Sequence, residues 1–248
     1  MSAAALACLI RERQPCVVLT GAGMSTESGL PDFRSATGIW AEVDPYEVAT
    51  IDAFRRNPER VWAWYGPRIS SFLEVEPNRG HLALAALERA GFVGAVVTQN
   101  IDTLHSRAGS REVVEVHGSI RRAVCLACGT PEPLDGVLEQ LADAPVPRCR
   151  ACSDVVKPDV VLFGELLPAS AMARAERLAR EASLLLVVGS SLQVWPVAEL
   201  PGETLAAGGS VAILNREPTG YDGRAELVVA ASAADTLAEV AAALGATV

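Results

Sequence analysis

Six short apolar runs constrain the fold of this 248-residue chain more than any other feature of its sequence. Each run has four to six residues, mostly Val, Leu and Ala. Runs of that length and composition are typical of strands buried on both faces, as in parallel sheets covered by helices. The runs lie at residues 16–20, 93–98, 113–116, 184–188, 211–214 and 227–230.

Helical patterns separate several of these runs, at residues 81–90, 171–182 and 233–244. Ser170 is a candidate N-cap for the second of these helices, and Gly91 is a candidate C-cap for the first. Strands that alternate with helices build a parallel sheet with right-handed crossovers. The sequence therefore predicts an α/β protein with a Rossmann-like, doubly wound parallel sheet.

Charge and hydropathy exclude several classes of protein. The chain has 21 Lys+Arg against 30 Asp+Glu, a formal net charge of −9, and no basic run of five residues. Nucleic-acid binding requires clustered positive charge, so we expect no nucleic acid partner. No segment approaches 18 apolar residues, and no basic residue precedes the apolar N-terminal stretch as in a secretory signal. We therefore expect a cytoplasmic protein that does not cross a membrane.

Four of the six cysteines form a paired set. Cys125-x₂-Cys128 and Cys149-x₂-Cys152 are separated by 20 residues, the spacing of two metal knuckles that close one tetrahedral site. Four thiolates leave no open position for water, which favours a structural zinc ion, one per chain, over a catalytic one. The alternative is a set of buried free cysteines. Cys8 and Cys16 lack a partner at this spacing and are expected in the core.

Two stretches break the alternation of strands and helices and define the expected domains. Residues 31–80 are expected to form a helical insertion, and residues 121–158, which contain the four cysteines, a zinc-binding module. Residues 1–30, 81–120 and 159–248 are expected to form the Rossmann-like domain. The prediction is thus one large domain with a small zinc-binding and helical second domain.

A glycine loop follows the first predicted strand directly. Gly21 and Gly23 would let backbone amides approach a diphosphate at this turn, although a tight turn without a ligand is an equally good interpretation of Gly-x-Gly alone. The dehydrogenase fingerprint requires a third glycine where this chain has Thr26. It also requires an acidic residue after a second strand, whereas Glu42 and Asp44 follow no such run. An ordinary dehydrogenase is therefore disfavoured.

The chain has three histidines, and His117 is the best candidate for a general base. It follows an alternating strand at the edge where doubly wound folds bind ligands, and a histidine accepts a proton near neutral pH. His81 opens a helix, where capping or exposure is expected, and His105 is expected to pack or to form a hydrogen bond locally. A structural role for His117 remains an alternative from the residues alone.

Several motifs in sequence order resemble those of the sirtuin family. Gly21-Ala22-Gly23 continues through Ser25, Glu27-Ser28-Gly29 and Pro31-Asp32-Phe33-Arg34 like the NAD-binding signature of that family. The further pieces are Thr98-Gln99-Asn100-Ile101-Asp102, His117-Gly118, the four cysteines, Val161-Leu162-Phe163-Gly164-Glu165, Gly189-Ser190-Ser191-Leu192 and Leu214-Asn215. The resemblance covers nearly the whole chain.

The resemblance implies that NAD⁺ is a co-substrate and that its contacts come from several loops. Ala22, Gly23 and the segment 189–191 would hold the diphosphate, Asn215 and Glu217 the adenosine end, and a loop at Phe33 and Arg34 would close over the nicotinamide ribose. From the residues alone, a polar turn is an alternative for Asn215 and Glu217. The cofactor-binding residues implied are Gly21, Ala22, Gly23, Asp32, Phe33, Arg34, Trp40, Gln99, Asn100, Ile101, Asp102, Gly189, Ser190, Ser191, Asn215, Glu217 and Ala233.

The resemblance also implies a reaction, removal of an acyl group from a protein lysine. The products would be nicotinamide, free lysine and an acyl-ADP-ribose. His117 would deprotonate a ribose hydroxyl, Asn100 would orient ribose or water, and Asp102 would receive the nicotinamide amide. An acceptor carboxylate suits an amide N–H, although a polar strand-to-helix turn is an alternative for residues 98–102.

The substrate is expected to be an acyl-lysine protein segment bound as an extended peptide by a monomeric enzyme. By the same resemblance, Val161, Phe163, Gly164 and Glu165 belong to an edge strand of the cleft, and Val194 to its opposite wall. Tyr65 and Arg68 resemble the Tyr-x-x-Arg of the branch that removes succinyl and malonyl groups, since Arg offers a forked cation to a carboxylate. The intervening Gly66-Pro67 is expected to weaken a helix there.

Other positions look more like deacetylating sirtuins, namely Asp32, Asp159-Val160-Val161-Leu162 and Ser191-Leu192. The acyl group could thus be succinyl, malonyl or acetyl. A redox enzyme is disfavoured by the missing third glycine and acidic ribose residue. Two other functions stay open from the sequence: a catalytically weak NAD-sensing zinc module and a protein mono-ADP-ribosyltransferase. The last would use the same residues as the deacylase.

Overall fold

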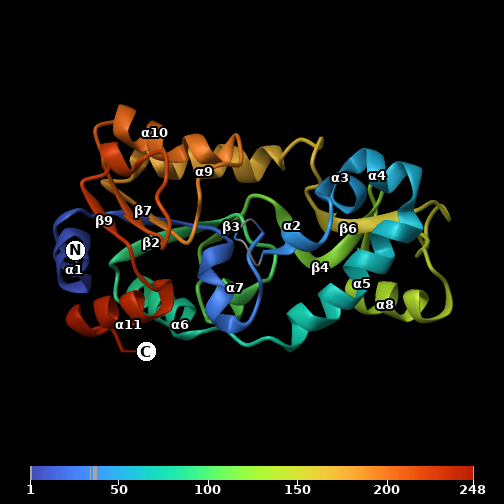
Figure 1. The fold of residues 1–248 in the computed structure, drawn as a ribbon, viewed down its shortest axis with the longest axis horizontal. Helices are drawn as coiled ribbons and strands as arrows, with labels where there is room; N and C mark the ends of the chain where they lie inside the picture. The colour runs from blue at the N-terminus through green and yellow to red at the C-terminus, as the bar shows by residue number, and fades with distance from the viewer. Residues whose placement is uncertain (1, 34, 36–37, 248) are drawn as a thin grey trace.

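The computed structural model describes residues 2–33, 35 and 38–247 and contains the predicted parallel sheet (Figure 1). Six strands run in the order β3-β2-β1-β7-β8-β9, and every neighbouring pair is parallel. Each of the six apolar runs forms one of these strands, so the predicted fold class is confirmed. The strands are β1 (Cys16–Thr20), β2 (Val93–Thr98), β3 (Val113–Glu115), β7 (Leu184–Val188), β8 (Ser210–Leu214) and β9 (Leu227–Val229).

Helices cover both faces of this sheet. Figure 1 shows α9 and α10 above the sheet and α6 and α11 below it, with α1 at the left end, where it packs on α11. Because side chains alternate along a strand, Val18 and Leu186 join the lower hydrophobic cluster while Val17 and Leu185 join the upper one. The helices are α1 (Ala3–Glu12), α6 (Arg79–Arg89), α9 (Ala169–Glu181), α10 (Leu200–Ala206) and α11 (Ala233–Ala243).

The strand order reverses direction between β1 and β7, which are neighbours in the sheet. The chain moves from β1 to β2 and β3 on one side, and from β7 to β8 and β9 on the other. Doubly wound folds bind ligands outside the carboxyl ends of the strands at such a switch point. The loops that begin at Gly21 and Gly189 leave β1 and β7 at this edge.

A second structural unit lies at the other end of the molecule in Figure 1 and contains a three-stranded antiparallel sheet, in the order β5-β4-β6. One hydrophobic cluster joins this sheet to the helical insertion, with Phe54 and Trp62 from the insertion and Ile120 and Val156 from the sheet. The indole Nε1 of Trp62 also donates to the Val156 carbonyl at 2.7 Å. The elements are α2 (Ile39–Glu42), α3 (Pro45–Val48), α4 (Ile51–Arg56), α5 (Pro58–Glu74), β4 (Gly118–Cys125), β5 (Pro131–Pro133), α8 (Leu134–Asp143) and β6 (Val156–Val160).

Short elements complete the fold near the switch point. The loop after β1 folds into two 3₁₀ turns, and α7 follows the polar segment after β2. These elements are η1 (Ala22–Met24), η2 (Thr26–Ser28), α7 (Leu104–Arg107), η3 (Val197–Glu199) and η4 (Asp222–Arg224).

Of the predictions about helix ends and interruptions, one is confirmed and two are wrong. Gly91 ends α6 with a φ of +82°, as expected of a glycine at a helix C-terminus. Ser170 is not an N-cap, because α9 begins one residue earlier and Pro168 precedes it. Gly66-Pro67 does not interrupt α5, which is continuous because Trp62 and Ile69, on either side of the pair, are anchored in the core. Among the described residues, no helix has both the length and the apolar content needed to span a bilayer.

Candidate active site and zinc centre

The glycine loops after β1 and β7 pack directly against each other. The Gly23 amide donates to the Gly189 carbonyl at 2.9 Å, and Gly21 donates to Val188 at 3.1 Å. A Cβ on Gly189, whose φ is +59°, would lie 2.4 Å from the amide nitrogen of Met24. These glycines therefore permit the close approach of two loops, a role that the sequence pattern did not reveal.

Three neighbouring backbone amides at this contact remain available. Within the described part of the chain, the amides of Ala22, Ser190 and Ser191 donate no hydrogen bond. Uncommitted amides gathered at the carboxyl edge of parallel strands form an anion-binding concavity. The arrangement can accept a diphosphate, although the Gly23 amide is already used within the protein.

A buried polar cluster lies beside the glycine loop. Asn100 Nδ2 donates to the Gly21 carbonyl and to Ser25 Oγ, both at 3.1 Å. Ser25 Oγ in turn donates to Asp102 Oδ2 at 2.6 Å, and Asp102 Oδ1 accepts from the Leu104 amide at 2.9 Å. Burial raises the pKa of Asp102, whereas these hydrogen bonds oppose that increase. Ser25 connects the two predicted site segments, whereas the sequence had placed it in the NAD-binding signature without a role of its own.

His117 is oriented by the segment that carries Gln99. Its Nδ1 lies 3.0 Å from the Gln99 carbonyl oxygen. A carbonyl only accepts hydrogen bonds, so Nδ1 carries a proton, and in a neutral ring Nε2 is then the basic nitrogen. Gln99 also donates from its side chain to Ser190 Oγ at 2.9 Å, which ties the β2 loop to the β7 loop. The predicted base therefore has the tautomer that a base at Nε2 requires.

A second buried cluster lies behind Asn100 and includes the other two histidines. His105 Nε2 lies 3.0 Å from Thr20 Oγ1, which donates to Thr98 Oγ1 at 2.8 Å. Thr98 Oγ1 also accepts the Asn100 amide at 3.0 Å. The His81 ring packs edge-on against the His105 ring, with centroids 4.8 Å apart. The two histidines thus support the segment that bears Asn100, as buried structural groups.

His81 and His105 are both fully buried. Burial lowers the pKa of His81 to about 2, with a further decrease from His105, and lowers the pKa of His105 to about 4. The expected capping role of His81 is confirmed, because its Nδ1 accepts the Asn78 amide in a capping box. The alternative, solvent exposure, is wrong, because His81 is buried. The sequence pattern of an opening helix cannot reveal that this turn packs against α7.

The residues predicted for the adenosine end meet at the same edge of the sheet. Asn215 Nδ2 donates to the Glu217 carbonyl at 2.7 Å, and Ala233 opens α11. Glu27 from the glycine loop links the two segments, since its carboxylate accepts Arg216 at 3.3 Å and Ser232 at 2.7 Å. Like Ser25, Glu27 had been placed in the signature without a role of its own.

The predicted cofactor loop carries an aromatic stack. Phe33 and Trp40 have ring centroids 5.2 Å apart, and Trp40 stacks on Trp64 of α5 at 6.1 Å. Asp32 Oδ1 accepts the Ser35 amide at 2.8 Å. Arg34, predicted to contact the cofactor, lies outside the described residues. The stack therefore connects this loop to the helix that carries Tyr65 and Arg68.

The segment 161–165 lies beyond β6, which ends at Val160. The Val161 amide donates to the His117 carbonyl at 2.8 Å, and Phe163 pairs with the helical insertion through a single bridge to Thr50. Gly164, with a φ of +89°, turns the chain there, so the expected edge strand is irregular. The Ile101 carbonyl accepts the Ile120 amide at 3.1 Å, so the loop after β2 also contacts β4.

Beyond this segment the surface is apolar. Glu165, Leu166 and Trp195 are among the residues that line a cavity of about 440 Å³. Leu166 and Trp195 are 94% and 68% exposed. Val194, in the opposite predicted wall, is half-buried next to Trp195. Both predicted walls therefore end in exposed apolar side chains.

Tyr65 and Arg68 interact, as their spacing on one helix face predicts. Burial raises the pKa of Tyr65, with a further increase from the charge of Glu165 and an opposing effect from Arg68. The Arg68 guanidinium lies 4.2 Å above the Trp64 ring and donates to the Trp64 carbonyl at 2.9 Å. Arg68 is therefore held against the aromatic stack, near Tyr65.

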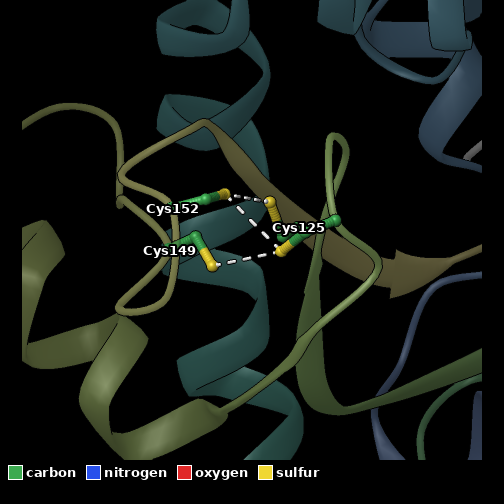
Figure 2. Close-up of side chains that lie close together, drawn as sticks. Cys125, Cys149 and Cys152 are labelled. Atoms are coloured by element: carbon green, nitrogen blue, oxygen red, sulfur yellow. Dashed lines mark hydrogen bonds between the residues drawn. The ribbon is translucent and has the colours of Figure 1, made fainter.

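The four paired cysteines converge between β4 and β6, and Figure 2 shows the sulfurs of Cys125, Cys149 and Cys152 turned toward one another. The Sγ–Sγ distances are 3.4 Å for Cys125–Cys152 and 3.7 Å for Cys128–Cys149. Four sulfurs at about 2.3 Å from one zinc ion would be about 3.8 Å apart in a tetrahedron. The donor set and spacing fit one zinc ion, as the sequence predicted.

The fold and these sites define a doubly wound nucleotide-binding protein with a tetrathiolate zinc module. A family model described as the Sir2 family matches residues 21–196. An NAD-dependent protein deacylase of Thermus thermophilus is 46% identical over 233 residues, covering 92% of this chain and 90% of the relative. The chain belongs to the Sir2 family, so the predicted sirtuin membership is confirmed.

Two further similarities span most of the chain. An NAD-dependent protein deacetylase of Geobacillus kaustophilus is 48% identical over 218 residues, 86% of each chain. A solved structure described as Sir2 with a p53 peptide and NAD⁺ superposes with a TM-score of 0.92 at 38% identity, covering 100% of both chains.

Proposed function

We propose that this chain removes acyl groups from lysine side chains of proteins and consumes one NAD⁺ for each acyl group. The products are nicotinamide, free lysine and an acyl-ADP-ribose. One observation carries the proposal: the His117 ring, oriented by its Nδ1 contact with the Gln99 carbonyl, lies on the same sheet edge as the uncommitted amides of two glycine loops. The deacylase and deacetylase names of its relatives support the same activity.

In this proposal, different residues at the sheet edge bind different parts of NAD⁺. The amides of Ala22, Ser190 and Ser191 hold the diphosphate, while Gly21, Gly23 and Gly189 let the two loops approach. The remaining contacts come from the cofactor loop, the adenosine end and the β2 loop. They are Asp32, Phe33, Arg34, Trp40, Gln99, Asn100, Ile101, Asp102, Asn215, Glu217 and Ala233.

The catalytic roles follow from the hydrogen bonds already described. NAD⁺ supplies an electrophilic ribose carbon and nicotinamide as the leaving group. His117 Nε2 takes a proton from a ribose hydroxyl, because Nδ1 is committed to the Gln99 carbonyl. Asn100, oriented by Gly21 and Ser25, positions ribose or water, and Asp102 accepts the nicotinamide amide through lone pairs left by its two internal hydrogen bonds.

The substrate is an acyl-lysine segment bound as an extended peptide between Val161–Glu165 and Val194. Within the described chain, Gly164 makes no backbone hydrogen bond, so its amide and carbonyl can pair with a peptide. Phe163 and the apolar surface at Trp195 provide flanking contacts. The zinc ion at the four cysteines is structural. The domain limits, cytoplasmic location, monomeric state and lack of a nucleic acid partner stay predictions of the sequence.

We further propose that the site accepts acidic acyl groups such as succinyl and malonyl as well as acetyl. Tyr65 and Arg68 interact on one face of α5, and Trp64 holds the guanidinium in place through its ring and carbonyl. A held guanidinium offers a charge-assisted partner to a distal carboxylate. Glu165 lies close enough to influence Tyr65, but Lys157 pairs with its charge.

Product mass spectrometry tests the activity. The purified chain with NAD⁺ and acetyl- or succinyl-lysine peptides should yield free lysine, nicotinamide and the matching acyl-ADP-ribose. A mono-ADP-ribosyltransferase would instead add ADP-ribose to protein, and an NAD sensor would release no nicotinamide. His117→Ala should lower turnover by about 10²-fold or more while NAD⁺ still binds. Near wild-type turnover in that variant would remove His117 from the mechanism.

Arg68→Met tests the acyl preference. Losing a hydrogen bond to a charged group should cost the succinyl reaction about 1.5 to 3 kcal/mol in kcat/KM, with acetyl-lysine spared. Tyr65→Phe should act in the same direction but less, because it removes one neutral donor. Equal losses for both substrates would make Arg68 structural and acetyl the favoured group.

A further inference from the structure

The sequence contains 20 arginines and a single lysine, Lys157. This lysine lies in β6 and is only 6% exposed, whereas no arginine of the described residues is buried. Lysine and arginine are not equivalent, since an ammonium directs three donors around one compact nitrogen while a guanidinium is a planar fork. The single lysine of an arginine-rich chain therefore marks a position with a specific requirement.

The surroundings of Lys157 meet that requirement. Its Nζ donates to the Val160 carbonyl at 2.7 Å and to the Pro158 carbonyl at 3.0 Å, and lies 3.2 Å from Glu165 Oε2. Three oxygens thus match the three donors of the ammonium. A buried cation is tolerated only when it is fully paired in this way.

These contacts hold the segment proposed to bind the substrate, residues 160–165, in a folded conformation around the Lys157 ammonium. Glu165 Oε2 also accepts the Leu162 amide at 2.8 Å, so one carboxylate oxygen joins Lys157 to the middle of the segment. On its other sides the segment is tied to the His117 carbonyl by Val161 and to the helical insertion by Phe163. The Lys157 ammonium brings the two ends of segment 160–165 together, because it contacts both the Val160 carbonyl and Glu165.

We propose that Lys157 is a positioning residue that fixes segment 160–165 beside His117 and neutralises Glu165 at the acyl-binding site. This proposal rests on the deacylase function proposed above. Lys157 itself contacts no reacting atom. It acts through the backbone that pairs with the substrate and through the charge of Glu165.

The charge gives the proposal a signature that a purely structural role lacks. The charge of Glu165 contributes to the raised pKa of Tyr65, so the carboxylate influences the end of the site where an acidic acyl group would bind. Without Lys157, the unpaired carboxylate would repel succinyl but not acetyl. Loss of the lysine should therefore change the preference between the two acyl groups as well as the affinity for peptide.

Kinetics of Lys157→Met with both acyl peptides tests these effects. We expect the KM for peptide to rise about tenfold or more, the size of losing charge-assisted hydrogen bonds, with the KM for NAD⁺ unchanged. The succinyl-to-acetyl ratio of kcat/KM should fall about threefold or more. Lys157→Arg, which keeps the charge, should restore the ratio. Arg122→Met removes an exposed ion pair to Asp159 on the neighbouring strand and should leave all three quantities unchanged.

Glu165→Gln provides a second test in case Lys157→Met does not fold. The amide keeps the shape and an acceptor for Leu162 but removes the negative charge, so the succinyl-to-acetyl ratio should rise. The positioning role is wrong if Lys157→Met and Glu165→Gln, where they fold, leave both the peptide KM and the succinyl-to-acetyl ratio of kcat/KM unchanged. A loss of activity that is equal for both acyl groups and both substrates overturns it as well, because that is the pattern of general destabilisation.

Amide hydrogen exchange separates this proposal from the proposed function. The Val161, Leu162 and Phe163 amides should be protected in the wild-type chain, and Lys157→Met should release them while β1 and β7 stay protected. Unchanged protection would refute the anchoring role whatever the enzyme does. If the wild-type chain turned over neither acyl peptide, the deacylase proposal would fail, and the exchange result would still decide the role of Lys157.

Discussion

The buried histidine pair predicts a steep loss of stability in mild acid. His81 and His105 are neutral in the folded protein, with pKa values of about 2 and about 4, against 6.5 for an ordinary histidine. Between those values the unfolded chain binds more protons than the folded one. The free energy of unfolding is therefore fully present above pH 6.5 and decreases as the pH falls toward the folded-state pKa values.

The size of the effect follows from the pKa values. At pH 5, 1.5 pH units below the unfolded pKa, each histidine should lower the free energy of unfolding by about 2 kcal/mol, at about 1.4 kcal/mol per pH unit. The two together amount to about 4 kcal/mol, a large part of the 5 to 15 kcal/mol that stabilises a typical protein.

Urea denaturation at pH 7.5 and pH 5, followed by tryptophan fluorescence, measures this loss. His81→Gln keeps an acceptor for the Asn78 amide, and His105→Gln keeps a donor near Thr20, so each removes one titration with little change in shape. Each variant should lose about 2 kcal/mol less than wild type between the two pH values.

Comparing variants with wild type cancels other titrations. Burial raises the pKa values of Asp102 and Glu115, which acts in the opposite direction, and zinc thiolates also take up protons in acid. These groups are the same in all three proteins. If wild type and both variants lose equal free energy between the two pH values, the neutral, buried histidine pair is not the source of the acid sensitivity.

Two further predictions concern the zinc centre and the glycine contact. Removing zinc with a chelator, or Cys125→Ser, should unfold the second unit, because structural zinc contributes about 10 to 16 kcal/mol of folding free energy in small modules. Metal analysis and circular dichroism measure the zinc content and the unfolding. A zinc-free protein of unchanged stability would contradict this prediction. Gly189→Ala should weaken NAD⁺ binding by at least about tenfold, because its Cβ would lie 2.4 Å from the Met24 amide nitrogen and its φ is +59°. Calorimetry measures the affinity for NAD⁺. Unchanged binding would mean that the two loops can separate without cost.

The parallel sheet could be predicted because its signal is local. Runs such as 184–188 are apolar throughout, and the burial of all five residues of β7 explains why. The zinc site could be predicted for a similar reason, because the Cys-x₂-Cys spacing fixes the geometry of the ligands. Local signals also misled: α5 passes through Gly66-Pro67 because contacts of Trp62 and Ile69 from other segments outweigh the cost of the proline.

The parts of the site that sequence reasoning missed depend on contacts distant in sequence. Ser25 donates to Asp102, and Glu27 accepts from Ser232. His105 was expected to pack locally, but its partner is Thr20 on a neighbouring strand. A polar residue after a strand looks the same whether its partner is solvent or a distant carboxylate. The motif identified the segments, while the fold decided which side chains meet.

The zinc centre and the substrate wall depend on one hydrophobic core. Cys125 and Cys149 belong to the same buried cluster as Trp62 and as Leu162 of the substrate segment. A closed tetrathiolate site offers no coordination position to a substrate, so the metal can affect the reaction only through this packing. The hydrogen bond from the Trp62 indole to the Val156 carbonyl joins the helical insertion to β6. In β6, Lys157 contacts the Val160 carbonyl at the start of the substrate segment. In the proposed enzyme, zinc would therefore act by stabilising the wall that binds the peptide beside His117.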